Sequence, residues 1–502
     1  MTVSRPALRT TPCATFLCAG LLSLLCWSVP VHAQPMGLPS MGSASSAELP
    51  PSLERTLGDA IMEQGRRDPD YIGDPDISQY LTAMGRNLAA HAPVSPGQPI
   101  TVFGVRDPQI NAFALPGGYI GINSGLLVSA QNESEVASVI AHEIGHVAQR
   151  HIARGMTQQS QSSGVMMAAV AAALLAALSG SGDLAMGIAA FGQAAAVDRQ
   201  LGFSRQAEQE ADRAGFEMMR KGGYDPRGMV SMFNLLSNSA RLNEGKGGGD
   251  YASTHPLSIQ RMSDIENRVS DMPLANPTSS DSFWYIRAKL RVVQARNSQA
   301  QRMAVEKLQL DAQRATGLEQ SAAWYGLAYV ALQKKDLARA EQALRNAQKD
   351  GGNSPEVAGL AVSLAVAQRN TAGALTLADD AWRRWPDSQG IALSRIEALQ
   401  KTGQDSVAVS FLQQRIKQWP DVPRLHQLLA QSQERLGEKV AARRTMAAYY
   451  DLTGALPTAV EQLQQARSMT TDFYVQSELD VQIRTLKERL KADRALLERF
   501  KS

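Results

Sequence analysis

The feature that most constrains the fold of this chain is a regular sequence repeat in its C-terminal half. Small residues recur there at a constant interval: Ala340, Ala374, Ala408 and Ala442. Two Trp-Pro-Asp triplets, beginning at Trp385 and Trp419, repeat at the same interval. A generic helical bundle would not keep register over four units, which run from about residue 321 to 456. The period therefore predicts similar supersecondary units that stack on their neighbours.

The interval between equivalent positions is about 34 residues, the period of tetratricopeptide repeats, in which each unit is a pair of helices. Trp324, Leu327 and Ala328 stand where the first helix of such a unit has Trp, Leu and a small residue. Stacked units form a curved solenoid that binds peptides or protein partners and carries no chemistry of its own. Two prolines and a Ser/Thr cluster mark a linker at residues 272–281. We therefore predict an all-α repeat domain at residues 282–502.

The region before the linker carries a His-Glu-Ile-Gly-His motif at residues 142–146. Residues four apart lie on one face of a helix, so His142 and His146 can offer imidazole nitrogens to a single ion. Glu143 is then placed to take a proton from a metal-bound water. A catalytic zinc needs three protein ligands and an open position for that water. A chance pattern on a surface helix is the alternative, and the flanking residues argue against it.

The helix around this motif is expected to be buried on two sides. Asn132 followed by Glu135 is typical of a capping-box-like helix start. An apolar stripe at helical spacing follows, on a face well away from the histidine pair. One face can therefore enter a core while the other faces a cleft, which suits a rigid platform for a metal ion.

A third ligand is expected from residues 204–212, which open a second helix that runs to about Arg220. Glu208 and Asp212 are four residues apart and share a face. One of them can bind the metal while the other holds the second nitrogen of a histidine, or a proton. Glu210 points elsewhere. An acidic helix face is usually solvated, and only the upstream histidine motif favours the metal-binding interpretation here.

In combination, these motifs resemble the HtpX/CAAX-prenyl-protease-1 family of zinc peptidases, and residues 111–119 are similar to the strand segment that precedes the catalytic helix in that family. The resemblance implies one zinc ion per chain, bound by His142, His146 and Glu208. It also implies that Glu143 is the general base and that Asp212 is a proton donor or an orienting residue. The transmembrane spans of the prenyl-protease branch are missing, which argues against a prenylated substrate.

Two further histidines lie near the motif residues in sequence or in the family pattern. His255, in a Ser-Thr-His-Pro turn, is either a simple hydrogen-bonding residue or a residue that approaches the zinc. In the second case it is an extra ligand at rest or a stabiliser of the oxyanion. His151 follows His146 by five positions, so helical spacing predicts that the two do not share a face. We interpret His151 as structural.

Residues 1–33 predict a cleaved secretory signal. Arg5 and Arg9 precede an apolar run, and a small-residue cleavage site ends at Ala33. An uncleaved membrane anchor is the alternative. All 3 cysteines lie inside this segment, so the mature chain has no disulfide and no thiol. Residues 34–50 are expected to be a disordered leader. The predicted compartment is the periplasm of a diderm bacterium.

The charge of the mature chain excludes one class of function. Two of the 51 basic residues lie in the signal, which leaves 49 basic against 48 acidic residues. Such a balance gives no electrostatic case for nucleic-acid binding.

Two segments have open interpretations. The Ala-rich residues 164–197 predict a helical hairpin that is a buried cap, a mobile lid or a membrane-touching element. Peripheral membrane association is therefore compatible with the sequence. Residues 114–122 predict either an edge strand to which an extended substrate adds or an ordinary hairpin.

The whole arrangement is mainly α: a gluzincin-like zincin of the α+β class at residues 51–271, then the tetratricopeptide solenoid. A secreted zinc peptidase joined to such a solenoid resembles the periplasmic proteases of outer-membrane quality control. The resemblance implies misassembled outer-membrane proteins as substrates and the β-barrel assembly machinery as a partner of the repeat domain. The predicted function is that of a zinc metalloendopeptidase. The alternative is a periplasmic chaperone or assembly scaffold whose peptidase activity is normally repressed.

Overall fold

The computed structural model describes residues 50–93, 99–158, 203–242, 251–273, 279–351 and 353–501. Contacts divide the chain into residues 1–41 and 42–502, and every described residue belongs to the second unit. The predicted signal, the leader up to residue 49 and the Ala-rich segment 164–197 lie outside the described residues. Among the described helices, none combines the length and the apolar character that crossing a membrane requires.

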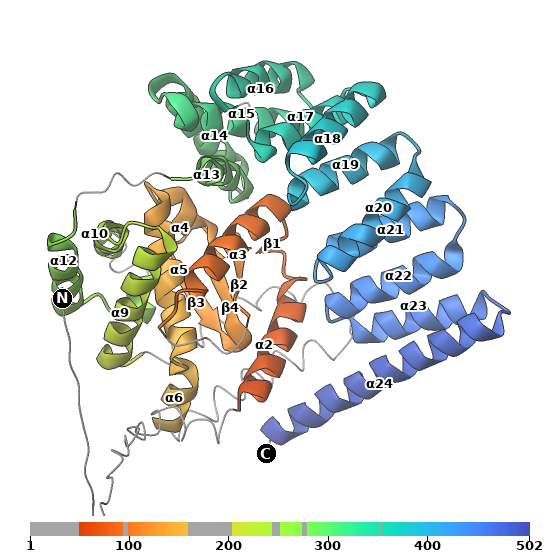
Figure 1. Cartoon of the computed structure of the whole chain (residues 1–502), viewed down its shortest axis with the longest axis horizontal. Helices are drawn as coiled ribbons and strands as arrows, with labels where there is room; N and C mark the ends of the chain where they lie inside the picture. The colour runs from red at the N-terminus through yellow and green to blue at the C-terminus, as the bar shows by residue number, and fades with distance from the viewer. Residues whose placement is uncertain are drawn as a thin grey trace, which may run out of the picture. The chain divides into compact units, whose positions relative to one another are not determined.

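A small four-stranded sheet lies at the centre of the N-terminal region (Figure 1). Its strands, in the order β1-β2-β4-β3, are β1 (Tyr71–Ile72), β2 (Thr101–Val105), β4 (Tyr119–Asn123) and β3 (Ala112–Leu115). The β2–β4 pair is parallel and the other two pairs are antiparallel. Since β4 is bonded on both sides, residues 114–122 form a hairpin in which, among the described residues, only the β3 part lies at an edge of the sheet. The edge-strand interpretation is therefore limited to β3.

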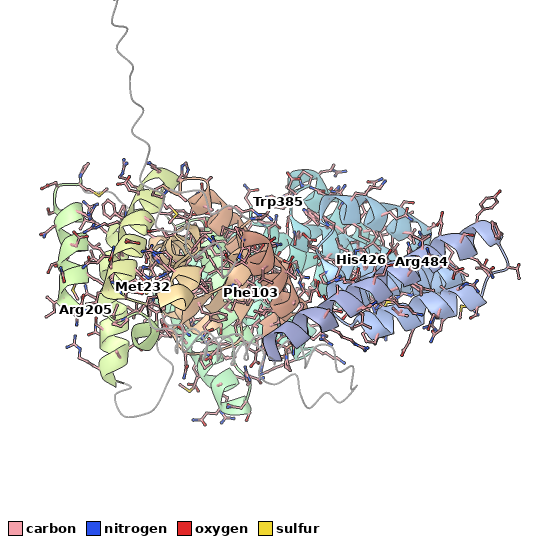
Figure 2. All side chains as sticks on the ribbon, turned by 90° about the horizontal axis from the view of Figure 1, so that it is seen from below. Phe103, Arg205, Met232, Trp385, His426 and Arg484 are labelled. Atoms are coloured by element: carbon pink, nitrogen blue, oxygen red, sulfur yellow. The ribbon has the colours of Figure 1, made fainter. Side chains whose placement is uncertain are left out.

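Alternation along the strands sends side chains into two apolar layers. On β2, Val102 packs against helices α3 (Pro75–Ala89) and α5 (Glu133–Ala148), whereas Phe103, labelled in Figure 2, packs against α2 (Pro51–Gly65) on the other face. The helices of this region are α2 (Pro51–Gly65), α3 (Pro75–Ala89), α4 (Ser124–Ser129), α5 (Glu133–Ala148), α6 (His151–Gln158), α9 (Arg205–Gly222), α10 (Arg227–Leu242), α11 (Tyr251–Thr254) and α12 (Ile259–Ser270). The sheet is thus covered on both faces.

Helices α5 and α9 pack with their backbones unusually close together. A Cβ atom added at Gly145 of α5 would lie 2.9 Å from Cα of Ala211 on α9 and 3.0 Å from its carbonyl oxygen. Only glycine fits at this crossing, because neither neighbouring atom belongs to a side chain that could move aside. Gly145 therefore sets the distance between two helices that carry the site residues.

The C-terminal region is a series of antiparallel helix pairs (Figure 1). Its helices are α13 (Asp281–Val293), α14 (Ser298–Arg314), α15 (Gly317–Gln333), α16 (Leu337–Gly351), α17 (Pro355–Ala367), α18 (Thr371–Arg384), α19 (Gln389–Lys401), α20 (Asp405–Gln418), α21 (Pro423–Arg435), α22 (Lys439–Leu452), α23 (Leu456–Ser468) and α24 (Phe473–Lys501). The second helices of four pairs begin at the interval of the sequence repeat, at Leu337, Thr371, Asp405 and Lys439. The predicted fold class is confirmed: a metallopeptidase-type α+β region followed by a helical solenoid.

The residues that revealed the repeat occupy equivalent places. The four regularly spaced alanines are all buried in the second helix of their pair. The turn between the two helices also repeats, because its left-handed residues are Lys335 (φ 59), Arg369 (φ 59), Gly403 (φ 73) and Gly437 (φ 80). Two of the four turns therefore place a residue with a side chain in a conformation that favours glycine.

The two regions share part of their apolar core. Phe283, Ile286 and Leu290 of α13, the first helix after the predicted linker, belong to the same buried cluster as the sheet and α5. A linker at residues 272–281 remains a prediction, and residues 274–278 within it are not described. A cut at this linker would remove a helix that the N-terminal core packs against.

Candidate metal centre

Helix α5 carries two of the predicted ligands side by side. Its start is fixed by Asn132, whose side chain accepts a hydrogen bond from the backbone N–H of Glu135 at 3.1 Å, so the predicted helix start is confirmed. Every residue of α5 is buried. The Nε2 atoms of His142 and His146 lie 2.9 Å apart. Two imidazole nitrogens can face each other at this distance only with a proton or a cation between their lone pairs.

Helix α9 brings two carboxylates to this histidine pair. Glu208 lies with one oxygen 3.5 Å from Nε2 of His142 and the other 3.5 Å from Nε2 of His146. Asp212, one turn further on, places Oδ1 2.9 Å from Nδ1 of His142. Glu208 therefore lies beside Nε2 of both histidines, and Asp212 lies at Nδ1 of His142. These are the two positions that the spacing of the acids allowed.

His255 joins the group from the turn that follows α11. Its Nδ1 lies 3.0 Å from Oε1 of Glu208 and 3.3 Å from Nε2 of His142. One ligand atom from each of His142, His146, Glu208 and His255 lies within 4.8 Å of the others, and all four residues are buried. Imidazole nitrogens with a carboxylate oxygen form a donor set that suits a divalent transition metal ion.

A buried arginine balances the two carboxylates. Arg261 of α12 donates to both oxygens of Asp212, at 2.7 and 2.8 Å, and its Nη1 lies 2.6 Å from Oε2 of Glu208. Burial tends to raise the pKa of Asp212, but the hydrogen bonds from Arg261 and His142 outweigh it and hold that pKa below its ordinary value. The pKa of Glu208 is also lowered, because the charge on His255 and the hydrogen bond from His142 outweigh burial. Both acids are therefore anionic.

Glu143 lies next to the donor cluster with one oxygen uncommitted. Its Oε1 accepts a hydrogen bond from the Tyr251 hydroxyl at 3.0 Å and lies 3.5 Å from Nε2 of His255. Within the described part of the chain, nothing donates a hydrogen bond to its Oε2, although the side chain is buried. An unsatisfied buried carboxylate oxygen costs free energy, so its presence calls for a functional explanation.

Comparison with known proteins identifies the family of this chain. Residues 75–269 match the model of peptidase family M48. The chain is 30% identical over 460 residues to the β-barrel assembly-enhancing protease of Escherichia coli (strain K12), an alignment that covers 90% of this chain and 92% of that protein. It is also 30% identical over 432 residues to the protein of the same name from Yersinia pestis, with 86% and 87% covered. The chain belongs to peptidase family M48.

A shorter relative matches less than half of this chain. The metalloprotease LoiP of Escherichia coli (strain K12) is 33% identical over 224 residues, which is 43% of this chain and 80% of that protein. The predicted relationship to metallopeptidases is confirmed, and the chain is an enzyme of the M48 type. The residues that the sequence selected all meet at one place: His142, Glu143, His146, Glu208, Asp212 and His255.

Two other residues at this site were not selected from the sequence. Tyr251 holds Glu143 and stacks on the ring of His255, with centroids 4.4 Å apart. It lies four residues before His255, a helical spacing that could have indicated the contact. Arg261 reaches the site from a helix that carries no recognisable motif, so only the tertiary structure reveals it.

His151 contradicts the prediction from helical spacing. Helix α5 ends at Ala148, and Arg150 has a φ of 53°, so the chain turns before α6 begins. As a result, Nδ1 of His151 lies 2.9 Å from Nδ1 of His146. Burial lowers the pKa of His151 to about 4, against the opposing effect of its hydrogen bond with Glu210. The prediction failed because it extended the helix through a residue at which the helix has ended.

Proposed function

We propose that this chain is a periplasmic zinc-dependent endopeptidase that degrades misassembled outer-membrane proteins and aids β-barrel assembly. The observation that carries the peptidase reaction is the buried group of His142, His146 and Glu208 beside the uncommitted oxygen of Glu143. The substrate class is supported by two relatives that are named β-barrel assembly-enhancing proteases. This chain aligns with most of the length of each. The periplasm follows from the predicted signal peptide.

In this proposal His142, His146 and Glu208 hold one zinc ion per chain. The donor set fits, since neutral imidazoles and a carboxylate are the ligands that catalytic zinc uses. When bound, zinc supplies Lewis acidity toward a peptide carbonyl and a water molecule. The anionic state of Glu208, which Arg261 supports from behind, suits a ligand that must be deprotonated.

The remaining steps belong to the protein's own side chains. Glu143 takes the proton of the attacking water on its free Oε2 and passes it to the leaving amine. Tyr251 keeps the carboxylate in position through Oε1. Asp212 accepts from Nδ1 of His142 and is paired with Arg261 through both oxygens. These contacts and its lowered pKa favour an orienting role for Asp212 over that of proton donor.

The test separates binding of the metal from its use. In the full-length protein, Glu143→Gln should keep about one zinc per chain but lose hydrolysis of an unfolded protein, because an amide is no base. Glu208→Ala should lose both. Elemental analysis and a cleavage assay measure the two properties. A Glu208→Ala protein with full zinc content would remove Glu208 from the ligands, and an active Glu143→Gln protein would remove the general base.

Glu143→Gln also serves to identify substrates. An inactive peptidase that still binds its substrate should retain it during purification from envelope extracts. We expect outer-membrane β-barrel proteins in the trapped fraction and, through the tetratricopeptide solenoid, components of the β-barrel assembly machinery. A trapped fraction that contains only soluble periplasmic proteins would contradict the proposed substrate class.

The position of His255 favours a second candidate function, that of a chaperone or assembly scaffold whose peptidase activity is repressed. A fourth protein ligand would close the position that a catalytic zinc leaves open for water. His255→Ala should then raise the basal cleavage of an unfolded protein. If His255 stabilises the oxyanion instead, the rate should fall by about 10²-fold or more. Unchanged kinetics would leave His255 with a structural role only.

A further inference from the structure

The two histidines of α5 are held from behind by different chemical groups. Nδ1 of His142 faces the carboxylate of Asp212 directly, at 2.9 Å. Nδ1 of His146 instead faces another imidazole, that of His151, at the same distance of 2.9 Å. A ligand histidine normally gives its second N–H to a carboxylate, a carbonyl oxygen or a water, so the imidazole partner of His146 is unusual.

The hydrogen bonds around His151 allow one consistent placement of protons. Nε2 of His146 points into the donor cluster and must be unprotonated to bind a metal, so its proton lies on Nδ1. Nδ1 of His151 must then accept that N–H. The proton of His151 consequently lies on Nε2, which faces Oε2 of Glu210 at 3.1 Å. The chain of donors runs from His146 through His151 to Glu210.

Glu210 is itself fixed at the far end of this chain. Arg154 of α6 donates to the same Oε2 at 2.8 Å, and Gln206 donates to Oε1 at 2.9 Å. His151 is buried, with a side chain only 1% exposed, whereas the side chain of Glu210 is 26% exposed. The three groups therefore connect the buried ring of His146 to a partly solvated ion pair.

The backbone supports this arrangement. Arg150 adopts a left-handed conformation, with φ 53°, in the two-residue turn between α5 and α6. Residues with a side chain rarely adopt this conformation, and a strained residue of this kind is retained where the surrounding structure needs it. The turn brings His151 back over the last turn of α5, which is what places its ring beside His146.

We propose that His151 is a positioning residue for the metal site: a neutral imidazole that accepts from Nδ1 of His146 and links it to Glu210. It fixes the tautomer and the ring orientation in which Nε2 of His146 can bind the metal. His142 and His146 are then unequal ligands, because the partner of His142 is an anion and the partner of His146 is neutral. This inference rests on the proposed zinc site.

The test compares two replacements of His151 in the full-length protein. In His151→Asn the side-chain oxygen takes the place of Nδ1 and can still accept from His146. In His151→Leu the volume is similar but the acceptor is gone. We expect His151→Leu to weaken zinc binding by about 10–100-fold, as for loss of a hydrogen-bond partner behind a ligand. His151→Asn should bind zinc nearly as well as the unmodified protein.

Zinc affinity is measured by competition with a chelator, and the visible spectrum of the cobalt-substituted protein reports the geometry of the ligands. The spectrum should change in His151→Leu and be restored in His151→Asn. Equal zinc affinity of the Leu variant and the unmodified protein would overturn the proposal. A His151→Asn variant that binds zinc as weakly as His151→Leu would also overturn it, because zinc affinity would then not depend on an acceptor at this position.

A third variant keeps the test decisive if His151→Leu does not fold. Glu210→Leu changes a partly exposed residue and removes the acceptor for Nε2 of His151, and it should weaken zinc binding in the same direction. Unchanged affinity in that variant would overturn the link to Glu210. Failure of the proposed function would look different: the unmodified protein itself would then bind no zinc at His142 and His146.

Discussion

The two regions of the molecule are built on different length scales. In the repeat region, each buried cluster joins neighbouring helices, such as the cluster from Ala392 to Leu429. In the peptidase region, one cluster combines residues from Ile72 to Leu290. Stability in the repeats is therefore close to a sum over neighbouring pairs, whereas the metal centre depends on segments far apart in sequence. Substitutions in the repeat region should therefore affect only neighbouring helices, whereas substitutions in the peptidase region should alter the geometry of the metal centre.

The largest expected effect lies where the two regions meet. Lys289 of α13 is buried and forms ion pairs with Asp74 at 2.6 Å and Asp76 at 2.9 Å, both at the start of α3. Burial lowers the pKa of Lys289, but these carboxylates outweigh it and hold the pKa well above its ordinary value. Lys289→Met leaves two carboxylates unpaired and should reduce the free energy of unfolding by about 3–5 kcal/mol. Urea denaturation measures the loss.

A matched control lies in the C-terminal region. Lys307 of α14 pairs with Asp311 of the same helix, but its side chain is 49% exposed. Lys307→Met should therefore change stability by less than about 1 kcal/mol. If the two substitutions reduced the free energy of unfolding equally, the ion pairs of Lys289 would contribute no more than a surface pair. The proposed difference between the two regions would then not hold at this contact.

The same difference explains what could be predicted from the sequence. The period of the repeat specified the helix pairs, because each pair is fixed by its own residues and its neighbours. The spacing of His142 and His146, and that of Glu208 and Asp212, specified which faces of α5 and α9 meet. Local spacing could not reveal Arg261, which arrives from another helix. It also misplaced His151, since nothing in the pattern shows that α5 ends at Ala148.

The second prediction compares the same change, glycine to alanine, in a helix of each region. Gly145→Ala on α5 would place a methyl group 2.9 Å from a backbone atom of α9, so the two helices must separate. His142 and His146 would then move away from Glu208, and a displacement of about 1 Å can cost about 10²-fold in rate. We expect weaker zinc binding and a loss of cleavage of that order, measured in the chelator competition and cleavage assays.

Gly359 in α17 of the repeats is the matched position. A Cβ there would approach no atom more closely than the Ser394 hydroxyl, at 3.3 Å, and that side chain can rotate. Gly359→Ala should leave cleavage unchanged and raise stability by up to about 1 kcal/mol through helix propensity. Full zinc affinity in Gly145→Ala would show that α5 and α9 tolerate separation, and that the site is less dependent on long-range packing than we infer.

The smallest expected effect tests whether the repeats behave as equivalent units. Arg369 is exposed and has a φ of 59° in a turn where Gly403 and Gly437 stand at the same place in later repeats. The left-handed conformation costs about 1–2 kcal/mol for a residue with a side chain, and glycine loses about 0.5–1 kcal/mol of this gain through its greater freedom when unfolded. Arg369→Gly should therefore stabilise the protein by about 0.5–1 kcal/mol.

Lys335 has the same φ of 59° one repeat earlier, so Lys335→Gly should have the same effect. The two gains should add, because the turns belong to different repeats and distant sites are usually independent. Arg369→Ala is the control: it removes the long side chain but keeps Cβ, and should give no gain. Urea denaturation compares the unmodified protein with the two single glycine variants, the double glycine variant and Arg369→Ala. Equal stability of Arg369→Gly and Arg369→Ala would show that the turn is not strained. Additive gains would show that each turn of the solenoid contributes independently to the free energy of unfolding, whereas the metal centre depends on residues far apart in sequence.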